Sequence, residues 1–254
     1  MKGIELKSPT QIAKLREANL IVADVLDVVS AAAAVGVSTW ELELVARRRL
    51  KELKAEPAFL GYRGYPAVLC TSPNQVIVHG IPRKDVVLKE GDILSVDFGA
   101  FKDGWCGDSA RTLRIGQVSE QAAALMEATR VSLDKAIEQC VPGNRLGDIG
   151  WAVQRHVEKY GYSVVEQFAG HGIGRHMHEP PQVMNYGPAG RGPRLSVGMV
   201  LAIEPMVNEG RPEVVIEEDG WTAVTKDGSL SAHFEHSVAI TENGPLVLSR
   251  AQNG

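Results

Sequence analysis

The sequence has few cysteines, and they show no pairing pattern. The three are Cys70, Cys106 and Cys140, and none belongs to a Cys-x-x-Cys motif. This excludes a disulfide framework and a cysteine-based zinc site, and it favours a reducing compartment. The charged amino-terminal residues 1–7 contain no apolar core and no small-residue cleavage site. We therefore predict no signal peptide and expect a cytoplasmic location.

Long apolar runs and an excess of positive charge are also missing. The most apolar stretch, residues 21–37, is interrupted by Asp24 and Asp27, so no membrane span is predicted. A formal net charge of −4 provides no basic field for holding nucleic acid. We interpret the basic run at residues 47–49 as the solvated side of a helix. The sequence thus predicts neither a membrane nor a nucleic-acid partner.

The composition is that of a folded globular chain. Hydrophobic residues make up 44% of the 254 residues, which is enough for a buried core. No Pro/Gly/Ser-rich linker divides the chain. We therefore expect residues 1–254 to form a single domain, built of two halves at about residues 8–115 and 116–248.

Helix signals occur twice in the same order. Ser8 and Gln11 flank a proline and predict the start of a long helix, and Ser38 with Glu41 forms a capping box for a second helix. Two further helical patterns cover residues 119–140 and 146–157. Aligning Gly36 with Gly143 superimposes the two pairs, which indicates a duplicated αβ unit, although chance helical periodicity would give a similar match.

Short strand-like runs follow each pair of helices. Gly, Asn or Asp residues separate most of them. We predict strands at residues 67–70, 75–78, 163–168, 199–203, 214–216, 221–225 and 234–240, in addition to a hairpin between residues 92 and 113.

The hairpin carries two aspartates. Asp103–Gly104 is a strong turn signal between two strand-like runs. With that turn, Asp97 faces Ala110 and Asp108 faces Gly99, so the two carboxylates are diagonal neighbours on one face. Like charges placed in this way destabilise a sheet. A divalent cation between them would remove the repulsion.

Three more residues are unusually placed. His171 stands among three glycines, which let the backbone approach its side chain closely. Glu204 ends an apolar run, and Glu235 lies inside another; a buried acid is costly without a partner. Each residue alone fits a structural role, such as an ion pair with an arginine. Together with the two aspartates they form a set of four carboxylates and one imidazole.

This set of donors suits a pair of divalent metal ions. Oxygen and nitrogen ligands without cysteine suit Mn, Fe(II), Co or Zn. Two such ions can lower the pKa of a water molecule and polarise a carbonyl group, which is hydrolytic chemistry.

The chain closely resembles the type I methionine aminopeptidases. The run Phe168-x-Gly-His171-Gly-Ile-Gly-x-x-x-His178, followed by residues 183–186, is similar to that family's signature. The resemblance extends from about residue 8 to residue 248. It implies an α+β pita-bread (creatinase/aminopeptidase) fold, in which a pseudo-twofold duplicated αβ unit surrounds a curved antiparallel sheet.

The resemblance also implies roles for the donors. Asp97 would bind one metal ion, Asp108 and Glu235 would bridge both ions, and His171 with Glu204 would complete the other site. Glu204 would also act as the general base. His178 would hydrogen-bond to the scissile carbonyl, and His79 would contact the substrate near its first peptide bond. The alternative for His79 is a loop histidine with satisfied hydrogen bonds.

The family's methionine pocket corresponds to aromatic and sulfur-containing residues. An aromatic box suits a thioether, which packs well against ring edges; without the donor set, residues 61–66 would be interpreted as an aromatic turn over the core. Phe59, Arg63 and Met177 depart from the residues that are common in the family, so fine specificity is left open. The pocket residues are Tyr62, Tyr65, Cys70 and Trp221, with Phe59 beside them.

Three alternatives share this fold. Prolidases and X-Pro aminopeptidases differ around Arg175 and Met177 and usually carry an extra domain. A type II methionine aminopeptidase would need a helical insertion, for which the spacing from His178 to Glu204 and on to Glu235 leaves little room. A non-enzymatic binding module would have lost ligands, whereas all five are present.

The resemblance therefore implies a metal-dependent exopeptidase. It would remove the initiator methionine from nascent polypeptides, would prefer small second residues, and would work near the ribosome. We expect a monomer.

Overall fold

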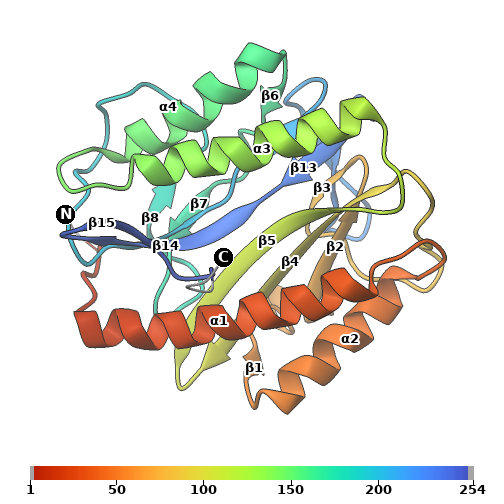
Figure 1. The fold of residues 1–254 in the computed structure, drawn as a ribbon, viewed down its shortest axis with the longest axis horizontal. Helices are drawn as coiled ribbons and strands as arrows, with labels where there is room; N and C mark the ends of the chain where they lie inside the picture. The colour runs from red at the N-terminus through yellow and green to blue at the C-terminus, as the bar shows by residue number, and fades with distance from the viewer. Residues whose placement is uncertain (1–2, 251–254) are drawn as a thin grey trace.

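Two pairs of helices and a curved antiparallel sheet make up the architecture (Figure 1). The structure is a computed structural model that describes residues 3–250. No helix in this range is both long and apolar enough to cross a membrane. The helices are α1 (Pro9–Ala32), α2 (Thr39–Glu52), α3 (Glu120–Glu138) and α4 (Leu146–Val157), with 3₁₀ turns η1 (Tyr62–Gly64) and η2 (Glu158–Tyr160).

Most of the strands belong to one nine-stranded sheet. Its central order is β1-β4-β5-β14-β9-β7-β8, with β2 beside β4 and β15 beside β14. These strands are β1 (Glu56–Pro57), β2 (Leu69–Pro73), β4 (Ile93–Lys102), β5 (Trp105–Arg114), β7 (Gly170–Gly172), β8 (Glu179–Val183), β9 (Val200–Ile203), β14 (Glu235–Thr241) and β15 (Gly244–Val247).

Two three-stranded sheets complete the fold. One has the order β13-β10-β6, and the other has the order β11-β12-β3. Their strands are β3 (Val76–Val78), β6 (Ser163–Val164), β10 (Met206–Asn208), β11 (Val214–Ile216), β12 (Ala223–Thr225) and β13 (Ser231–His233).

The helix starts agree with the predicted signals. Ser8 and Gln11 form a capping box at α1, and Ser38 and Glu41 form another at α2. Each satisfies free N–H groups of the first turn. Between the helices of each pair the chain turns at a glycine with positive φ, Gly36 at 87° and Gly143 at 98°. Both halves therefore use the same helix–glycine–helix arrangement, as the alignment predicted.

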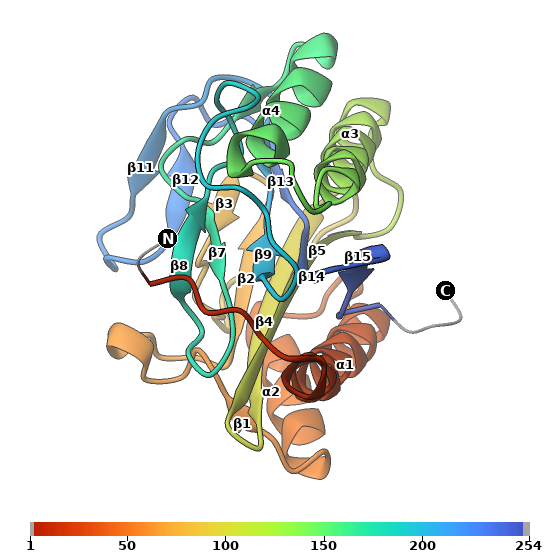
Figure 2. The ribbon, with the colours of Figure 1, turned by 90° about the vertical axis from the view of Figure 1, so that its left-hand side faces the viewer.

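Side-chain alternation divides the sheet into two faces. Val96 and Phe98 of β4 pack into the core under α1 and α2, while Leu201 of β9 and Val238 of β14 pack into the core under α3 and α4. Figure 2 shows both helix pairs on this side of the sheet. Residues one step away along each strand point to the opposite face. That face carries the candidate site.

The aspartate hairpin forms as predicted. Asp97 faces Ala110 and Gly99 faces Asp108 in the β4–β5 ladder. Asp103 (φ 49°) and Gly104 (φ 75°) both have the positive φ that such a two-residue turn requires. Several other strands were not predicted. The most notable is β8, which begins with Glu179, Pro180 and Pro181, because prolines argue against a strand unless it lies at an edge.

Candidate metal centre and substrate cavity

The sheet register places three predicted donors on one face. Asp97 and Glu235 both lie opposite Ala110, one from β4 and one from β14. Asp108 is two residues from Ala110 along β5, so its side chain points to the same face. The three carboxylates therefore converge around the small side chain of Ala110.

The remaining two donors reach the same face from the second half of the chain. Ala202 of β9 pairs with Ser237 on one side and with His171 of β7 on the other. Since Ser237 is two residues from Glu235, His171 shares the face of the carboxylates. Glu204 lies two residues beyond Ala202, directly after β9. All five predicted donors are thus brought together by strand register.

The candidate ligand atoms are close together, and three of the carboxylate oxygens lack a hydrogen-bond partner within the described range. One ligand atom each from Asp108, His171 and Glu235 lies within 4.8 Å of the others. His171 Nε2 is 3.5 Å from Glu204 Oε1 and 4.0 Å from Asp108 Oδ2. Among the described residues, no hydrogen-bond partner exists for the buried oxygens Asp97 Oδ1, Asp108 Oδ1 and Glu235 Oε1. Unpartnered buried carboxylate oxygens of this kind are the ligands a cation would satisfy.

Burial dominates the electrostatics of the carboxylates. It raises the pKa of Asp97 to about 7. Burial and then repulsion from the neighbouring carboxylates raise the pKa values of Asp108, Glu204 and Glu235 well above the usual range. Four acids in one buried site resist simultaneous ionisation unless positive charge is added. Divalent cations would supply that charge, so the residues present fit a metal site.

The imidazole of His171 is oriented as a ligand. Its Nδ1 lies 3.0 Å from the carbonyl oxygen of Gly172, which can only accept, so the proton is on Nδ1. Burial lowers the pKa of His171 to about 4, and the neutral ring therefore directs the lone pair of Nε2 towards the carboxylates. A second hydrogen bond that fixes the tautomer is typical of metal-binding histidines.

The glycines around His171 provide close packing. A Cβ on Gly170 would collide with the carbonyl oxygen of Ala202, and a Cβ on Gly172 would collide with that of Pro180. Strand β7 therefore fits between β8 and β9 only with glycines on either side of His171. These two glycines therefore let the backbones of β8 and β9 approach β7 closely.

The predicted substrate residues line the same cavity as the donors. This cavity has a volume of about 180 Å³. The rings of Tyr65 and Trp221 pack edge to face with their centroids 5.2 Å apart, and the ring centroid of His79 lies 6.2 Å from that of Trp221. The cavity is lined by Phe59, Tyr62, Arg63, Tyr65, Cys70, His79, Asp97, Asp108, His171, Met177, His178, Glu204, Trp221 and Glu235.

Two histidines stand beside the donors. His178 lies 4.2 Å from the ring of His171 and stacks on Tyr62 at 5.3 Å. Burial lowers the pKa of His79 to about 4, and burial followed by the charge of Arg63 lowers the pKa of His178. Both rings are therefore neutral at neutral pH, and each keeps one N–H donor and one acceptor for a peptide group.

Two serines that we did not predict hold the donor strands together. Ser109 Oγ donates to the carbonyl oxygen of Glu235 at 2.7 Å, and Ser237 Oγ donates to that of Asp108 at 3.0 Å. The exposed fractions of Ser109 and Ser237 are 3% and 0%. The only sequence signal was their proximity to the two carboxylates. Each serine bonds to the backbone of the other strand, and this depends on the register of β5 and β14.

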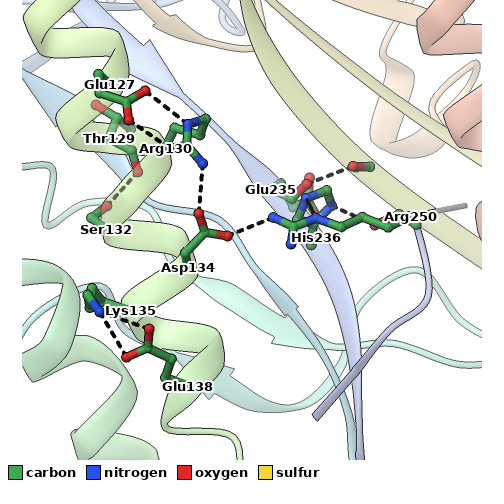
Figure 3. A network of polar contacts seen from close by, with 12 residues as sticks. Glu127, Thr129, Arg130, Ser132, Asp134, Lys135, Glu138, Glu235, His236 and Arg250 are labelled. Atoms are coloured by element: carbon green, nitrogen blue, oxygen red, sulfur yellow. Dashed lines mark hydrogen bonds and ion pairs between the residues drawn. The ribbon is translucent and has the colours of Figure 1, made fainter. Parts of the chain in front are cut away.

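The chain end supports the other side of β14. His236 follows Glu235 on β14, so its side chain points to the opposite face. Its Nε2 accepts a hydrogen bond from Arg250 (Figure 3). Arg250 also pairs with Asp134 of α3 at 2.7 Å, and His236 Nδ1 lies 2.7 Å from Ser249 Oγ. The strand that carries Glu235 is thus held from both faces.

Comparison with known proteins identifies the family. The model of metallopeptidase family M24 matches residues 13–242. The chain belongs to this family. Membership implies bound divalent metal, and the unpartnered oxygens above are consistent with it.

Several relatives that are 45–50% identical to this chain are named methionine aminopeptidases. The enzyme of Clostridium acetobutylicum is 50% identical over 97% of this chain and 98% of its own. That of Aquifex aeolicus is 49% identical over 97% of this chain and 99% of its own. The structure of the Thermotoga maritima methionine aminopeptidase matches with a TM-score of 0.96 at 47% identity, covering 98% of this chain and all of that one.

The M24 fold is also found in more distant structures. The prolidase from Pyrococcus furiosus matches with a TM-score of 0.78 at 23% identity, covering 97% of this chain and 66% of that one. This likeness concerns the fold alone. The predicted α+β pita-bread architecture is confirmed, and so is the predicted resemblance to methionine aminopeptidases.

Proposed function

We propose that this protein is a methionine aminopeptidase that releases the initiator methionine from nascent polypeptides. The observation that carries the proposal is that four carboxylates and one imidazole share a sheet face and a cavity with an aromatic pocket. Relatives with this name match nearly the whole chain. Residues 1–254 would act as a single catalytic domain, with halves at about residues 8–115 and 116–248.

The donors would hold two divalent ions, which could be Mn, Fe(II), Co or Zn. Asp97 would bind one ion, Asp108 and Glu235 would bridge the two, and His171 with Glu204 would complete the second site. When bound, such ions polarise the scissile carbonyl and lower the pKa of water. Four carboxylates and two divalent ions would together be neutral, so bound ions would favour the ionised carboxylates despite their burial.

The pocket would bind the methionine side chain. Tyr65 and Trp221 present ring edges and faces, and Cys70 lies beside Tyr65 in the buried wall. The Tyr65 hydroxyl donates within the wall, since the carbonyl oxygens of Leu69 and Gly80 both lie 3.1 Å from it. Its ring is therefore fixed, and an unbranched thioether can fill the space without meeting a free polar group. Phe59 and Tyr62 would complete the enclosure.

The chemical step needs a proton acceptor and a hydrogen-bond donor. Glu204 would take a proton from the attacking water at a carboxylate oxygen and pass it to the leaving amine when the C–N bond breaks. The N–H of His178 would donate to the carbonyl oxygen as negative charge develops there. His79 would position the first peptide group. The shared cavity and the neutral state of both imidazoles support these roles.

Substrate preference and cellular context belong to the same proposal. A small second residue would be preferred because a long side chain next to the scissile bond would meet the cavity rim. The protein would act as a monomer in the cytoplasm, close to the ribosome, where nascent amino termini emerge.

The test is methionine release from Met-Ala-Ser. Metal-stripped protein is reconstituted with Mn, Fe(II) or Co, and the peptide is analysed by mass spectrometry. Clean loss of one methionine that depends on metal is expected. Met-Lys-Ser serves as the comparison, and release at a similar rate from both peptides would contradict the expected preference. An intact Met-Ala-Ser with every metal would overturn the proposal.

A further inference from the structure

Among the described residues, a single cationic side chain lines the cavity. Its charged lining residues are Arg63 and the four carboxylates of the donor set. If two divalent ions neutralise the carboxylates, as proposed above, Arg63 is the uncompensated charge of the cavity. No carboxylate within residues 3–250 lies within ion-pair distance of Arg63, so this charge remains available to a substrate.

Arg63 is also at the mouth of the cavity. Among the lining residues, only Arg63 and His178 are exposed, whereas the donors and pocket residues are buried or half-buried. A polypeptide with its first residue in the pocket and its first peptide bond at the donors must leave through this opening. Its following residues therefore pass His178 and Arg63.

Arg63 lies in a tight turn with positive φ angles that backbone hydrogen bonds hold in place. Arg63 has a φ of 49°, between Gly61 at 82° and Gly64 at 91°. A left-handed conformation is costly for arginine. Backbone hydrogen bonds from Gly61 N to Tyr65 O (2.8 Å) and from Gly64 N to Gly61 O (3.2 Å) hold this turn.

An aromatic stack fixes the guanidinium relative to the site. The guanidinium carbon of Arg63 lies 5.4 Å from the ring centroid of Tyr62, within the range of a cation–π contact. Tyr62 in turn stacks on His178. The positive charge is thus held on the outer side of a stack whose inner ring borders the donors.

We propose that Arg63 is a specificity-determining residue that selects substrates by the charge of the third residue. The inference rests on the proposed function and deepens it. Asp or Glu at the third position would be attracted to Arg63, and Lys or Arg would be repelled. The substrates favoured would be amino termini that combine methionine and a small second residue with an acidic third residue.

The size of the effect follows from Coulomb's law. For unit charges about 7 Å apart in a solvent-exposed opening, the interaction corresponds to a preference of roughly threefold to tenfold for an acidic over a basic residue. Salt would reduce this preference because exposed charges are screened. A shape-based preference would be insensitive to salt.

The experiment compares three amidated peptides, Met-Ala-Asp-Gly, Met-Ala-Gln-Gly and Met-Ala-Lys-Gly, on the metal-loaded protein. The quantity measured is the ratio of kcat/KM for the Asp and Lys peptides. We expect an Asp:Lys ratio of about threefold to tenfold for the parent protein. It should fall in Arg63→Gln, fall further or invert in Arg63→Glu, and decrease between about 20 and 500 mM salt.

Arg83→Gln is the matched control. Arg83 is an exposed arginine that pairs with Asp85 and lines a neighbouring groove instead of this cavity. Its ratio should equal that of the parent. Because each ratio is taken within one protein, a general loss of activity cancels.

The outcomes separate the two proposals. Release from Met-Ala-Gln-Gly, with an Asp:Lys ratio in both Arg63→Gln and Arg63→Glu that equals the ratio of the parent protein, would overturn the role of Arg63. It would leave the proposed function intact. Absence of release from all three peptides with every metal would instead overturn the proposed function.

Discussion

Glu235 is a residue of this site that we expect to lower the stability of the metal-free protein while it contributes to metal binding. Its buried carboxylate repels Asp108 and Glu204, and one of its oxygens lacks a partner in the described part of the chain. We expect Glu235→Gln to raise the Tm of the metal-free protein by several degrees, on the order of 2–4 °C per kcal/mol for a chain of this size. The added stabilisation by metal should disappear.

Calorimetry with and without a divalent metal would check this prediction. Exposed Glu242 offers a control, since Glu242→Gln should change neither Tm value. A lower Tm for metal-free Glu235→Gln would show that the carboxylate stabilises the fold by itself, contrary to the argument.

The hydrogen bonds that Ser109 and Ser237 form between β5 and β14 lead to a second prediction at the residue scale. Ser109→Ala and Ser237→Ala each remove one buried hydrogen bond, at a cost of about 0.5–1.5 kcal/mol of unfolding free energy. Because the lost bonds hold the backbone of Glu235 and Asp108, metal affinity should also fall, by about tenfold or more.

Ser132→Ala is the matched control. Ser132 is equally buried and donates to the carbonyl oxygen of Thr129 at 2.7 Å, but it lies in α3. Denaturation should show a similar loss of stability, while titration calorimetry should show unchanged metal affinity. Equal metal affinities in all three variants would exclude a positioning role for the two serines.

The contact between α1 and β5 carries an element-scale prediction. A Cβ on Gly107 would lie 2.7 Å from backbone atoms of Ala18 and Asn19. Gly107→Ala must separate the helix from the strand, at a cost of about 1–3 kcal/mol. The same movement would disturb Asp108, whose N–H donates to Asn19 Oδ1 at 3.3 Å. Both stability and metal affinity should therefore fall.

Gly143→Ala separates the two effects. Gly143 has a positive φ of 98° but open space around it, so its substitution costs about 1–2 kcal/mol through backbone strain alone. Metal titration should distinguish the variants. Unaltered metal affinity in Gly107→Ala would mean that β5 absorbs the shift without moving Asp108.

At the scale of elements, the sequence predicted those features that depend on residues close together in the chain. The capping boxes at Ser8 and Ser38 and the turn at Asp103–Gly104 formed as predicted, because each depends on neighbours in sequence. Strands β7 and β8 were not predicted. β7 consists of Gly170, His171 and Gly172, which favour no strand by themselves, and it exists because β8 and β9 pair with its two edges.

The site was predictable in composition but not in geometry. Each donor could be recognised as a misplaced polar residue in an apolar run or a glycine loop. Their common face depends on the register between β5, β14, β9 and β7, which join segments far apart in sequence. The hydrogen bonds of Ser109 and Ser237 between β5 and β14 depend on the same register. No local sequence pattern encodes that register.

The whole molecule should respond to pH in a way that depends on metal. In the metal-free protein the raised pKa values, with Asp97 at about 7, mean that the folded state binds more protons than the unfolded state above pH 6.5. Stability should therefore rise as the pH falls from about 8 to 6.5. Below pH 6.5 the lowered pKa values of His79 and His171, about 4, and of His233 and His236, about 3, oppose this trend. The unfolded histidines bind protons first, so the gain in stability should level off.

Bound metal should remove the first of these trends. Divalent ions keep the carboxylates ionised in the folded state, so the gain between pH 8 and 6.5 should vanish. Chemical denaturation at several pH values, with chelator or with metal, gives the comparison. Parallel curves in the two conditions would contradict a metal site built from these acids.

The central claim is that the five donors hold divalent metal that is required for methionine release. The most direct measurement adds metal stepwise to the chelated protein and follows bound metal and methionine release from Met-Ala-Ser on the same samples. We predict that release rises with bound metal in the parent protein, and that Asp108→Asn, which should bind less metal, shows little release. Undiminished release from the fully chelated protein, or parent-like metal binding and release in Asp108→Asn, would contradict the account.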